Sequence, residues 1–398
     1  MMQKREMRVA VQQNGNHISV SVDDDVISYE VQGIDLPEIT NWAFCLWHVL
    51  PAAMRRGASI HVSGPVDHAT IAAAQRYSET WELWSPYKHR AVKVTAEGEP
   101  PRAAPGRRKD LYLFSGGLDS ADMLVRHSDS ESTGVALTAR GFDYAVDDSK
   151  FNELAKKVAP FLQKYNFEHV IVKTNAIRYA KVHASYPVRL VGLANLFSGL
   201  FEQAAYAADF DWAQDIAVAP WSCNHVTNSY WKTSDMEVRA LCDDRTRAEK
   251  VSNVAECDVA LRSLSFCSNR EVHPENCGSC KKCLRMKVML RAMTGEVPEI
   301  FKEMSFNDEM VASIDLRNTL ERAFFIDLLQ KTRAANLLDQ FPAMEKHFSA
   351  EFGATPGYRP PSWTGFFPGF LKAFVPSIIK QNIAKVLSAE NRPSKFER

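Results

Sequence analysis

A glycine-rich turn at residues 114–120 has the residue types best suited to binding a phosphate group. It reads Phe-Ser-Gly-Gly-Leu-Asp-Ser and lies between a short apolar run and a segment with helical spacing. Gly116 and Gly117 have no Cβ atoms, so backbone N–H groups there can approach phosphate oxygens closely. Ser115 and Ser120 add hydroxyl donors, and the N-terminus of the following helix favours an anion. An ordinary strand-to-helix turn is the alternative interpretation.

Asp119 within this turn needs a separate explanation, because a carboxylate does not attract a phosphate. It either holds a Mg²⁺ ion that neutralises a polyphosphate, or it fixes the conformation of the turn. No Gly-Lys-Ser or Gly-Lys-Thr follows the glycines, so the turn is not a Walker loop.

Four closely spaced cysteines form a second group that could do chemistry. They are Cys267, Cys277, Cys280 and Cys283, with the spacing C-x9-C-x2-C-x2-C. Four such thiolates can meet at one tetrahedral Zn²⁺, and a site with four sulfur ligands is structural because no coordination position is open. A redox dithiol and an iron–sulfur cluster are the alternatives.

The composition excludes several classes of protein. Of the 398 residues, 45% are apolar and 24% charged, which is typical of folded globular proteins and suggests two or three domains. The 48 Lys and Arg balance the 48 Asp and Glu, so we expect no nucleic-acid partner. We find no signal peptide and no uncharged apolar run of the ~20 residues that cross a bilayer. The cysteine usage suits a reducing compartment, so we expect a cytoplasmic protein without an integral membrane segment.

The segment before the glycine-rich turn has the pattern of a small α+β accessory domain, residues 1–97. We expect a hairpin at 7–22, strands at 26–31, 59–62 and 91–95, and helices at 36–56 and 67–84. This domain either contacts a substrate or partner, or serves as scaffold. Residues 98–109 are rich in glycine, proline and arginine, which is typical of a linker.

Residues 110–299 alternate strand and helix patterns. We expect strands at 111–114, 135–139, 169–172 and 216–219, and helices at 120–126, 149–165 and 190–208. This alternation predicts an α/β fold, a doubly wound parallel sheet with helices on both faces. Such sheets bind ligands at the carboxyl ends of their strands, where the glycine-rich turn lies.

Residues 300–398 form a helical C-terminal extension, with its clearest helix at 316–338. The apolar run at 366–387 also contains lysines. It packs back onto the protein, or it lies on a membrane surface or grips a partner.

The turn Ser-Gly-Gly-Leu-Asp-Ser resembles the SGGxDS signature of the PP-loop ATP pyrophosphatases. These enzymes cleave ATP between the α and β phosphates and transfer AMP to a substrate oxygen. The resemblance implies an adenine-nucleotide-binding domain that uses ATP and Mg²⁺. It places the following residues around the phosphates: Ser115, Gly116, Gly117, Asp119 and Ser120.

Together with the four cysteines, residues 110–293 resemble the QueC family, the 7-cyano-7-deazaguanine synthases. Tyr-Pro-Val-Arg at 186–189 is similar to the family's Pro-Gly-Arg-Asn segment, and Arg-Ala-Glu at 247–249 to its Lys-Ala-Glu segment. The resemblance makes Arg189 and Arg247 candidate phosphate contacts, although either could form a surface salt bridge instead. Asp119, Ser120, Arg189 and Arg247 are thus the candidate catalytic residues.

The family's substrate segment, Gly-Tyr-Pro-Asp-Cys-Arg, is not found where expected. Trp221, Tyr230 and Trp231 occur in this region and could stack on a flat heterocycle, and Asp235 could hydrogen-bond it. Packing in the core explains the aromatic residues equally well.

The extended architecture resembles the QueC-like proteins of bacterial anti-phage systems, such as QatC. It implies activation of a carboxylate, with a 7-deazaguanine as substrate class, for amide or nitrile formation or for attachment to a partner protein of a defence operon. tRNA thiolation by a PP-loop enzyme and a nucleotide-binding subunit without turnover are the alternatives.

Overall fold

The fold was analysed in a computed structural model of the chain. It describes residues 6–352 except 130–131, 146–148, 181–184, 219, 307–308, 310 and 312–313. The chain divides into two compact units, Met1–Glu345 and Lys346–Arg398, and the features below belong to the first. The apolar run predicted at 366–387 lies outside the described residues.

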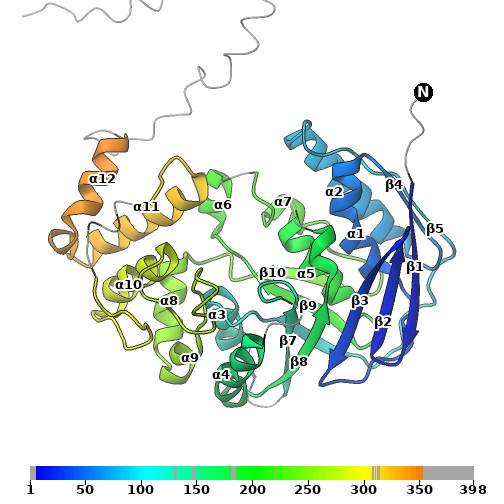
Figure 1. Cartoon of the computed structure of the whole chain (residues 1–398), viewed down its shortest axis with the longest axis horizontal. Coiled ribbons are helices and arrows are strands. Elements are labelled where there is room, and N and C mark those ends of the chain that lie inside the picture. Colours follow the sequence, from blue (N-terminus) through cyan, green and yellow to red (C-terminus); the bar gives the residue numbers. More distant parts are fainter. Residues whose placement is uncertain are drawn as a thin grey trace, which may run out of the picture. The chain divides into compact units, whose positions relative to one another are not determined.

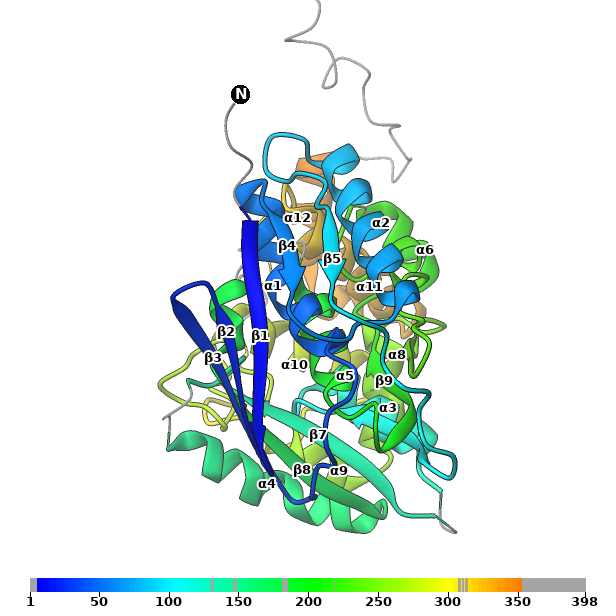
Figure 2. The same ribbon diagram turned by 90° about the vertical axis from the view of Figure 1, so that its right-hand side faces the viewer.

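Ten strands form one sheet in the order β10-β9-β6-β7-β8-β3-β2-β1-β4-β5 (Figures 1 and 2). The strands are β1 Glu6–Asn14, β2 His17–Val22, β3 Asp25–Gln32, β4 Ser59–Val62, β5 Val94–Ala96, β6 Arg108–Leu113, β7 Gly134–Arg140, β8 Phe167–Thr174, β9 Phe201–Ala207 and β10 Glu237–Leu241. Neighbours are parallel except at the pairs β1–β2, β2–β3 and β3–β8. The predicted α/β class and the mostly parallel character of the sheet are confirmed.

The N-terminal strands and two helices follow the sequence pattern closely. The β1–β2 hairpin turns at Gly15, whose φ of 56° is the left-handed conformation that an Asn-Gly turn favours. Helix α2, His68–Trp84, begins after Asp67, whose side chain accepts a hydrogen bond from Thr70 N. Helix α1, Ala43–Arg56, begins later than predicted. The backbone N–H groups of Leu36 and Ile39 donate to side chains of the β1–β2 hairpin, so the chain there is held in a non-helical conformation.

The order of the central strands reverses beside β6. The chain runs from β6 to β7 and β8 on one side, then continues with β9 and β10 on the other side of β6. All four contacts among these strands are parallel. Because crossovers between parallel strands are right-handed, this reversal puts the intervening helices on opposite faces and opens a crevice at the carboxyl ends of β6 and β9.

The helices cover the two faces as this rule requires. The remaining helices are α3 Leu118–His127, α4 Lys150–Lys164, α5 Tyr186–Asn195, α6 Trp212–Val218, α7 His225–Asn228, α8 Arg247–Ala255, α9 Asp258–Ser263, α10 Lys281–Thr294, α11 Thr319–Ala334 and α12 Pro342–Phe352. Helix α5 packs against α1, whereas α3 packs against α8 and α4 against α9 (Figure 1). Helix α11 of the C-terminal extension contacts α8 and α10.

Two predicted elements are wrong. The apolar run 190–208 is not one helix, because it contains the end of α5 and the whole of β9, separated by turns around Ser198-Gly199. A buried strand and a buried helix have the same continuous apolar character, so periodicity did not separate them. Residues 216–218 of the strand predicted at 216–219 are instead the end of helix α6, and strand β10 was not predicted.

The N-terminal strands and the central strands join through one antiparallel pair. Strand β3 pairs with β8, with Val31 opposite Val172 and Tyr29 opposite Thr174. The predicted accessory segment and the predicted nucleotide-binding segment therefore share one sheet. No helix among the described residues is long and apolar enough to cross a membrane.

Candidate functional site

The glycine-rich turn follows β6 directly and is folded on itself. The Ser115 N–H donates to Ser120 Oγ at 3.2 Å, and the Gly117 N–H donates to Ser115 Oγ at 3.3 Å. The Ser120 hydroxyl donates to the Gly117 carbonyl at 3.0 Å. Gly116 has a φ of +78°, and a Cβ there would lie 3.0 Å from a methyl group of Leu154. The turn thus needs glycine at 116, and it presents the N-terminus of α3 to the crevice.

Asp119 is paired with two cations of helix α8. Arg247 donates to both of its carboxylate oxygens, from Nε at 3.2 Å and from Nη2 at 2.6 Å. Lys250 Nζ lies 3.6 Å from Asp119, and the Lys250 side chain is 0% exposed. Burial raises the pKa of Asp119, but the attraction of Arg247 and Lys250 outweighs it and holds that pKa below its usual value. The Asp119 carboxylate is therefore ionised and compensated within the protein.

Asp209, just after β9, is the second carboxylate near Arg247. Its Oδ1 lies 3.7 Å from Arg247 Nη2, and its Oδ2 accepts a hydrogen bond from Trp221 Nε1 at 3.0 Å. Burial raises the pKa of Asp209, and repulsion from Asp119 adds to this, whereas Arg247 offsets it only in part. The Arg247 guanidinium group thus lies beside two carboxylates, Asp119 with a lowered pKa and Asp209 with a raised pKa.

Three adjoining cavities open around the glycine-rich turn. The loop cavity, of about 470 Å³, is lined by the turn, Asp119 and Arg247, and by parts of the cysteine segment and α11. The inner cavity, of about 90 Å³, reaches between β6, β7 and β9 and is lined mainly by apolar side chains. The open cavity, of about 710 Å³, is lined by Phe142, Tyr186, Arg189 and Trp221 among others. The turn borders the first two.

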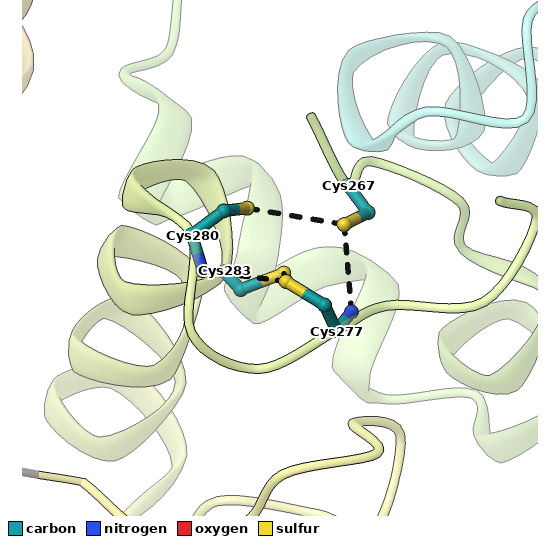
Figure 3. Close-up of side chains that lie close together, drawn as sticks. All are labelled: Cys267, Cys277, Cys280 and Cys283. Atoms are coloured by element: carbon teal, nitrogen blue, oxygen red, sulfur yellow. Dashed lines mark hydrogen bonds between the residues drawn. The ribbon is translucent and has the colours of Figure 1, made fainter. Parts of the chain in front are cut away.

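The four cysteines come together as their spacing predicts (Figure 3). Their sulfur atoms all lie within 4.8 Å of one another. The Cys267 and Cys280 sulfurs are 3.8 Å apart, and the Cys277 and Cys283 sulfurs are also 3.8 Å apart. All four cysteines are free thiols rather than disulfides. Within the described part of the chain this is the one cluster of cysteine, histidine and acidic side chains that could hold a metal ion.

Backbone donors surround the sulfur atoms. The N–H groups of Asn269 and Cys277 point to Cys267 Sγ at 3.3 and 3.4 Å, and those of Ser279 and Cys280 point to Cys277 Sγ at 3.4 and 3.3 Å. Such N–H donors stabilise thiolate ligands. Gly278 has a φ of +87°, and a Cβ there would lie 2.0 Å from the Glu303 carbonyl oxygen. The cysteine segment is therefore built around a cluster of four sulfur atoms that could hold a metal ion.

Helix α11 of the C-terminal extension closes one wall of the loop cavity. Phe324 stacks on Phe210 at a centroid distance of 4.8 Å, and the guanidinium carbons of Arg247 and Arg285 lie 4.3 and 4.6 Å from the Phe324 ring centroid. Glu321 pairs with Arg285 at 2.5 Å. Burial lowers the pKa of Arg285 to about 10. The extension thus touches Arg247, the cation that also pairs with Asp119 of the glycine-rich turn.

Arg189 lies apart from Arg247, on helix α5. Its guanidinium carbon lies 5.1 Å from the Phe142 ring centroid and 5.0 Å from that of Tyr186. Its buried Nε has no hydrogen-bond partner. The residue lines the inner and open cavities but not the loop cavity. The carbonyl of Arg189 contacts His48 Nε2 of helix α1 at 3.0 Å, so the N-terminal segment positions this helix.

The four residues of the 221–235 region have different surroundings. Trp221 lines the open and loop cavities. Trp231 is 0% exposed in the core and donates to Tyr206 Oη at 3.0 Å. Tyr230 contacts Thr80 Oγ1 at 3.0 Å, and Asp235 accepts from Asn41 at 2.8 Å. Among them, Trp221 is the one that borders the cavities described above.

Three residues of the site had not been identified from the sequence. Lys250 follows Arg247 by three positions, a spacing that places both on one face of a helix, so the signal was present. Asp209 lies just after β9, which the sequence pattern predicted as helix. The pattern therefore did not indicate that Asp209 lies at the carboxyl end of a strand. Phe324 is distant in sequence from the turn, and no local pattern indicates its contact with Arg247.

No family model, no curated protein and no solved structure matches this chain. The chemistry of the site is therefore the basis for assigning its function.

Proposed function

We propose that this protein is an ATP-dependent enzyme that transfers AMP to a carboxylate and releases pyrophosphate. The observation that supports the proposal is the place of the turn at 114–120. It follows β6 where the strand order reverses, it precedes a helix N-terminus, and it borders the loop cavity, which Arg247, Lys282 and Arg285 also line. Donors and positive charge thus converge where a nucleotide would enter.

The residues of the turn would bind the phosphates during the reaction. The substrate carboxylate attacks the α phosphorus, the bond between the α phosphorus and the bridging oxygen breaks, and pyrophosphate leaves. Backbone N–H groups at Gly116 and Gly117 and the hydroxyls of Ser115 and Ser120 stabilise the charge on the leaving group. An amine then displaces AMP and forms an amide. Positioning and charge neutralisation account for the rate, so no side chain acts as covalent nucleophile.

Arg247 is the cation that this mechanism assigns to the leaving phosphates. Its two hydrogen bonds to Asp119 and its contact with the Phe324 ring leave the guanidinium little freedom. Asp119 therefore acts in this proposal as a positioning residue for Arg247, a role distinct from the two that the sequence suggested for it.

The open cavity suits a flat heterocyclic acid. Phe142, Tyr186 and Trp221 offer aromatic surface, and the Arg189 guanidinium lies over the first two rings. This combination fits a 7-deazaguanine carboxylic acid, the substrate class of the QueC family. Reaction with a small amine gives an amide, a second adenylation gives a nitrile, and an amine of a partner protein gives a conjugate. We place this chemistry in anti-phage defence, as the resemblance to QatC implies.

Two metal ions accompany this proposal. A Zn²⁺ with four bonds of about 2.3 Å has sulfur–sulfur edges of about 3.8 Å, which matches the two distances of 3.8 Å between cysteine sulfurs. We infer a structural zinc site at these cysteines. Mg²⁺ would be bound chiefly by the nucleotide, with Asp143 as the nearby carboxylate of the loop cavity, since Arg247 and Lys250 already pair with Asp119. It would supply charge neutralisation to the leaving pyrophosphate.

The test is ATP–pyrophosphate exchange that depends on added 7-carboxy-7-deazaguanine. We expect exchange in the intact chain, and a loss of about 10²–10³-fold in Arg247→Met, since this variant removes a charged donor from the site. Arg262→Met is the matched control, because Arg262 is an exposed arginine paired with Asp258 on helix α9. Asp119→Ala should also lose exchange. A chain that binds no ATP would refute the proposal.

The same samples separate the alternatives by mass spectrometry. Formation of AMP indicates catalysis, whereas intact bound ATP indicates a nucleotide-binding subunit without turnover. Binding of tRNA with a steep salt dependence would favour thiolation instead.

A further inference from the structure

Ser265 connects the cysteine segment to the glycine-rich turn. Its backbone N–H donates to the Gly116 carbonyl at 2.8 Å, two residues before the first cysteine of the cluster. The Ser265 side chain is buried, and among the described residues its Oγ has no hydrogen-bond partner. Ser265 also lines the loop cavity. A buried hydroxyl without a partner is unfavourable in the free protein and is available to a ligand in that cavity.

His273 lies on the same wall, between the first and second cysteines. It is 8% exposed, and its ring packs against Tyr144 at a centroid distance of 5.2 Å. Neither ring nitrogen has a partner with hydrogen-bond geometry. The nearby backbone of Cys267 could engage only one of the two. An imidazole ring always offers at least one N–H donor or one lone pair, so His273 presents a free polar atom beside the cavity that it lines.

The charge of this wall is positive. Arg270 and Lys282 both line the loop cavity, and neither makes an ion pair within 4.0 Å among the described residues, although the Asp143 carboxylate of the same cavity attracts Lys282. Arg270 donates to the backbone carbonyl of Asp143, which leaves its charge uncompensated. Arg247 and Arg285, in contrast, are already paired with Asp119 and Glu321. Free donors and unpaired cations together recognise an oxyanion.

We propose that Ser265, His273 and Lys282 form an oxyanion subsite that binds the pyrophosphate part of ATP across the loop cavity from the glycine-rich turn. This inference rests on the proposed function and names residues that the resemblance does not assign. The cysteine cluster then has a role beyond holding the fold. It shapes the segment that carries two of the three donors, so metal loss would weaken pyrophosphate binding.

The experiment is calorimetric titration of the full chain with inorganic pyrophosphate and, separately, with AMP. We expect Ser265→Ala and His273→Phe to weaken pyrophosphate binding by about tenfold to a hundredfold, as the loss of one hydrogen bond to a charged ligand does. His273→Phe keeps a ring against Tyr144. Binding of AMP and metal content should not change.

Ser263→Ala is the matched control. Ser263 is also buried in this segment, but its hydroxyl donates to the Ala260 carbonyl at 2.6 Å and does not line the loop cavity. We expect this variant to bind pyrophosphate like the parent chain. If Ser265→Ala lost its metal or failed to fold, the result for His273→Phe would decide.

Several outcomes would overturn the inference. One is unchanged pyrophosphate binding in both variants, and another is a parent chain that binds no pyrophosphate. A third is a loss confined to 7-carboxy-7-deazaguanine, since the subsite would then hold the acid. A parent chain that binds pyrophosphate and ATP, with both variants weakened, but catalyses no ATP–pyrophosphate exchange would support the subsite and refute the proposed function, so the two failures are distinguishable.

Discussion

Replacement of Asp119 by asparagine tests the charge network behind the glycine-rich turn. Asparagine keeps the shape of the side chain but removes its charge. Arg247, whose Nη2 lies 2.6 Å from Asp119, then retains only Asp209 at 3.7 Å. Lys250 is 0% exposed and retains its hydrogen bond of 2.6 Å to the Ala208 carbonyl and the attraction of the more distant Asp122 and Asp209. Among the described residues, this buried ammonium group is left without an ion-pair partner.

The expected loss of stability is large. Removal of one partner from a buried ion pair costs about 3–5 kcal/mol. Asp209 remains near Arg247, so we expect the lower end, about 3 kcal/mol in the free energy of unfolding. Urea denaturation at neutral pH measures this value. The pKa of Asp119 is lower in the folded than in the unfolded protein. The Asp119 carboxylate therefore contributes its full stabilisation at pH values above the unfolded pKa of about 3.9. This stabilisation is lost as the pH falls through the pKa of the folded protein.

Asp209→Asn is the control for this measurement. Burial raises the pKa of Asp209, so its charge is less favourable in the folded protein and its removal should cost less. Asparagine also retains an acceptor for Trp221. The reasoning would be refuted if Asp119→Asn cost less than about 1 kcal/mol, or if the two substitutions cost the same.

Three further predictions concern other parts of the molecule. Burial lowers the pKa of His48 to about 4, so stability should fall as the pH drops from about 6.5 to 4, by about 1.4 kcal/mol per unit. His48→Gln should reduce this slope in urea titrations, whereas substitution of the exposed His68 should not. Gly278→Ala should lower metal content after dialysis at least tenfold, because the new Cβ would meet the Glu303 carbonyl; full retention of metal would contradict this. Phe324→Ala should cost about 3 kcal/mol of unfolding free energy and raise the KM for ATP, and an unchanged KM would remove α11 from the site.

Local sequence signals predicted the elements that depend on neighbouring residues. Asn14-Gly15 placed the first hairpin turn, and the strand expected at 59–62 is β4 with the same bounds. The cysteine spacing predicted a cluster whose sulfurs lie within 4.8 Å of one another. The cysteines outside the cluster are all buried: Cys45, Cys223, Cys242 and Cys257.

Features that depend on tertiary contacts could not be predicted from the sequence. The chain from 190 to 208 is mostly apolar because most of α5 and β9 is buried, and such burial weakens the periodicity that distinguishes helix from strand. Strand β10 pairs with β9 at the edge of the sheet. Because the sequence pattern predicted helix where β9 lies, it gave no partner strand for β10. The contact of Phe324 with Arg247 joins two segments that are distant in the sequence, and no sequence motif links them. The domain boundaries at 97, 109 and 299 and the roles of the candidate catalytic residues stay predictions.

The antiparallel pairing of β3 with β8 has a practical consequence for dissecting the molecule. A truncated chain that began at residue 98 would leave the backbone groups of Ile171 to Thr174 without their partner strand. Bare edges of this kind recruit strands from other molecules, so such a fragment would aggregate rather than behave as a minimal catalytic core. It would also lack His48, which contacts the helix carrying Arg189. Deletion experiments should therefore remove segments from the far end of the chain and leave the first hundred residues in place.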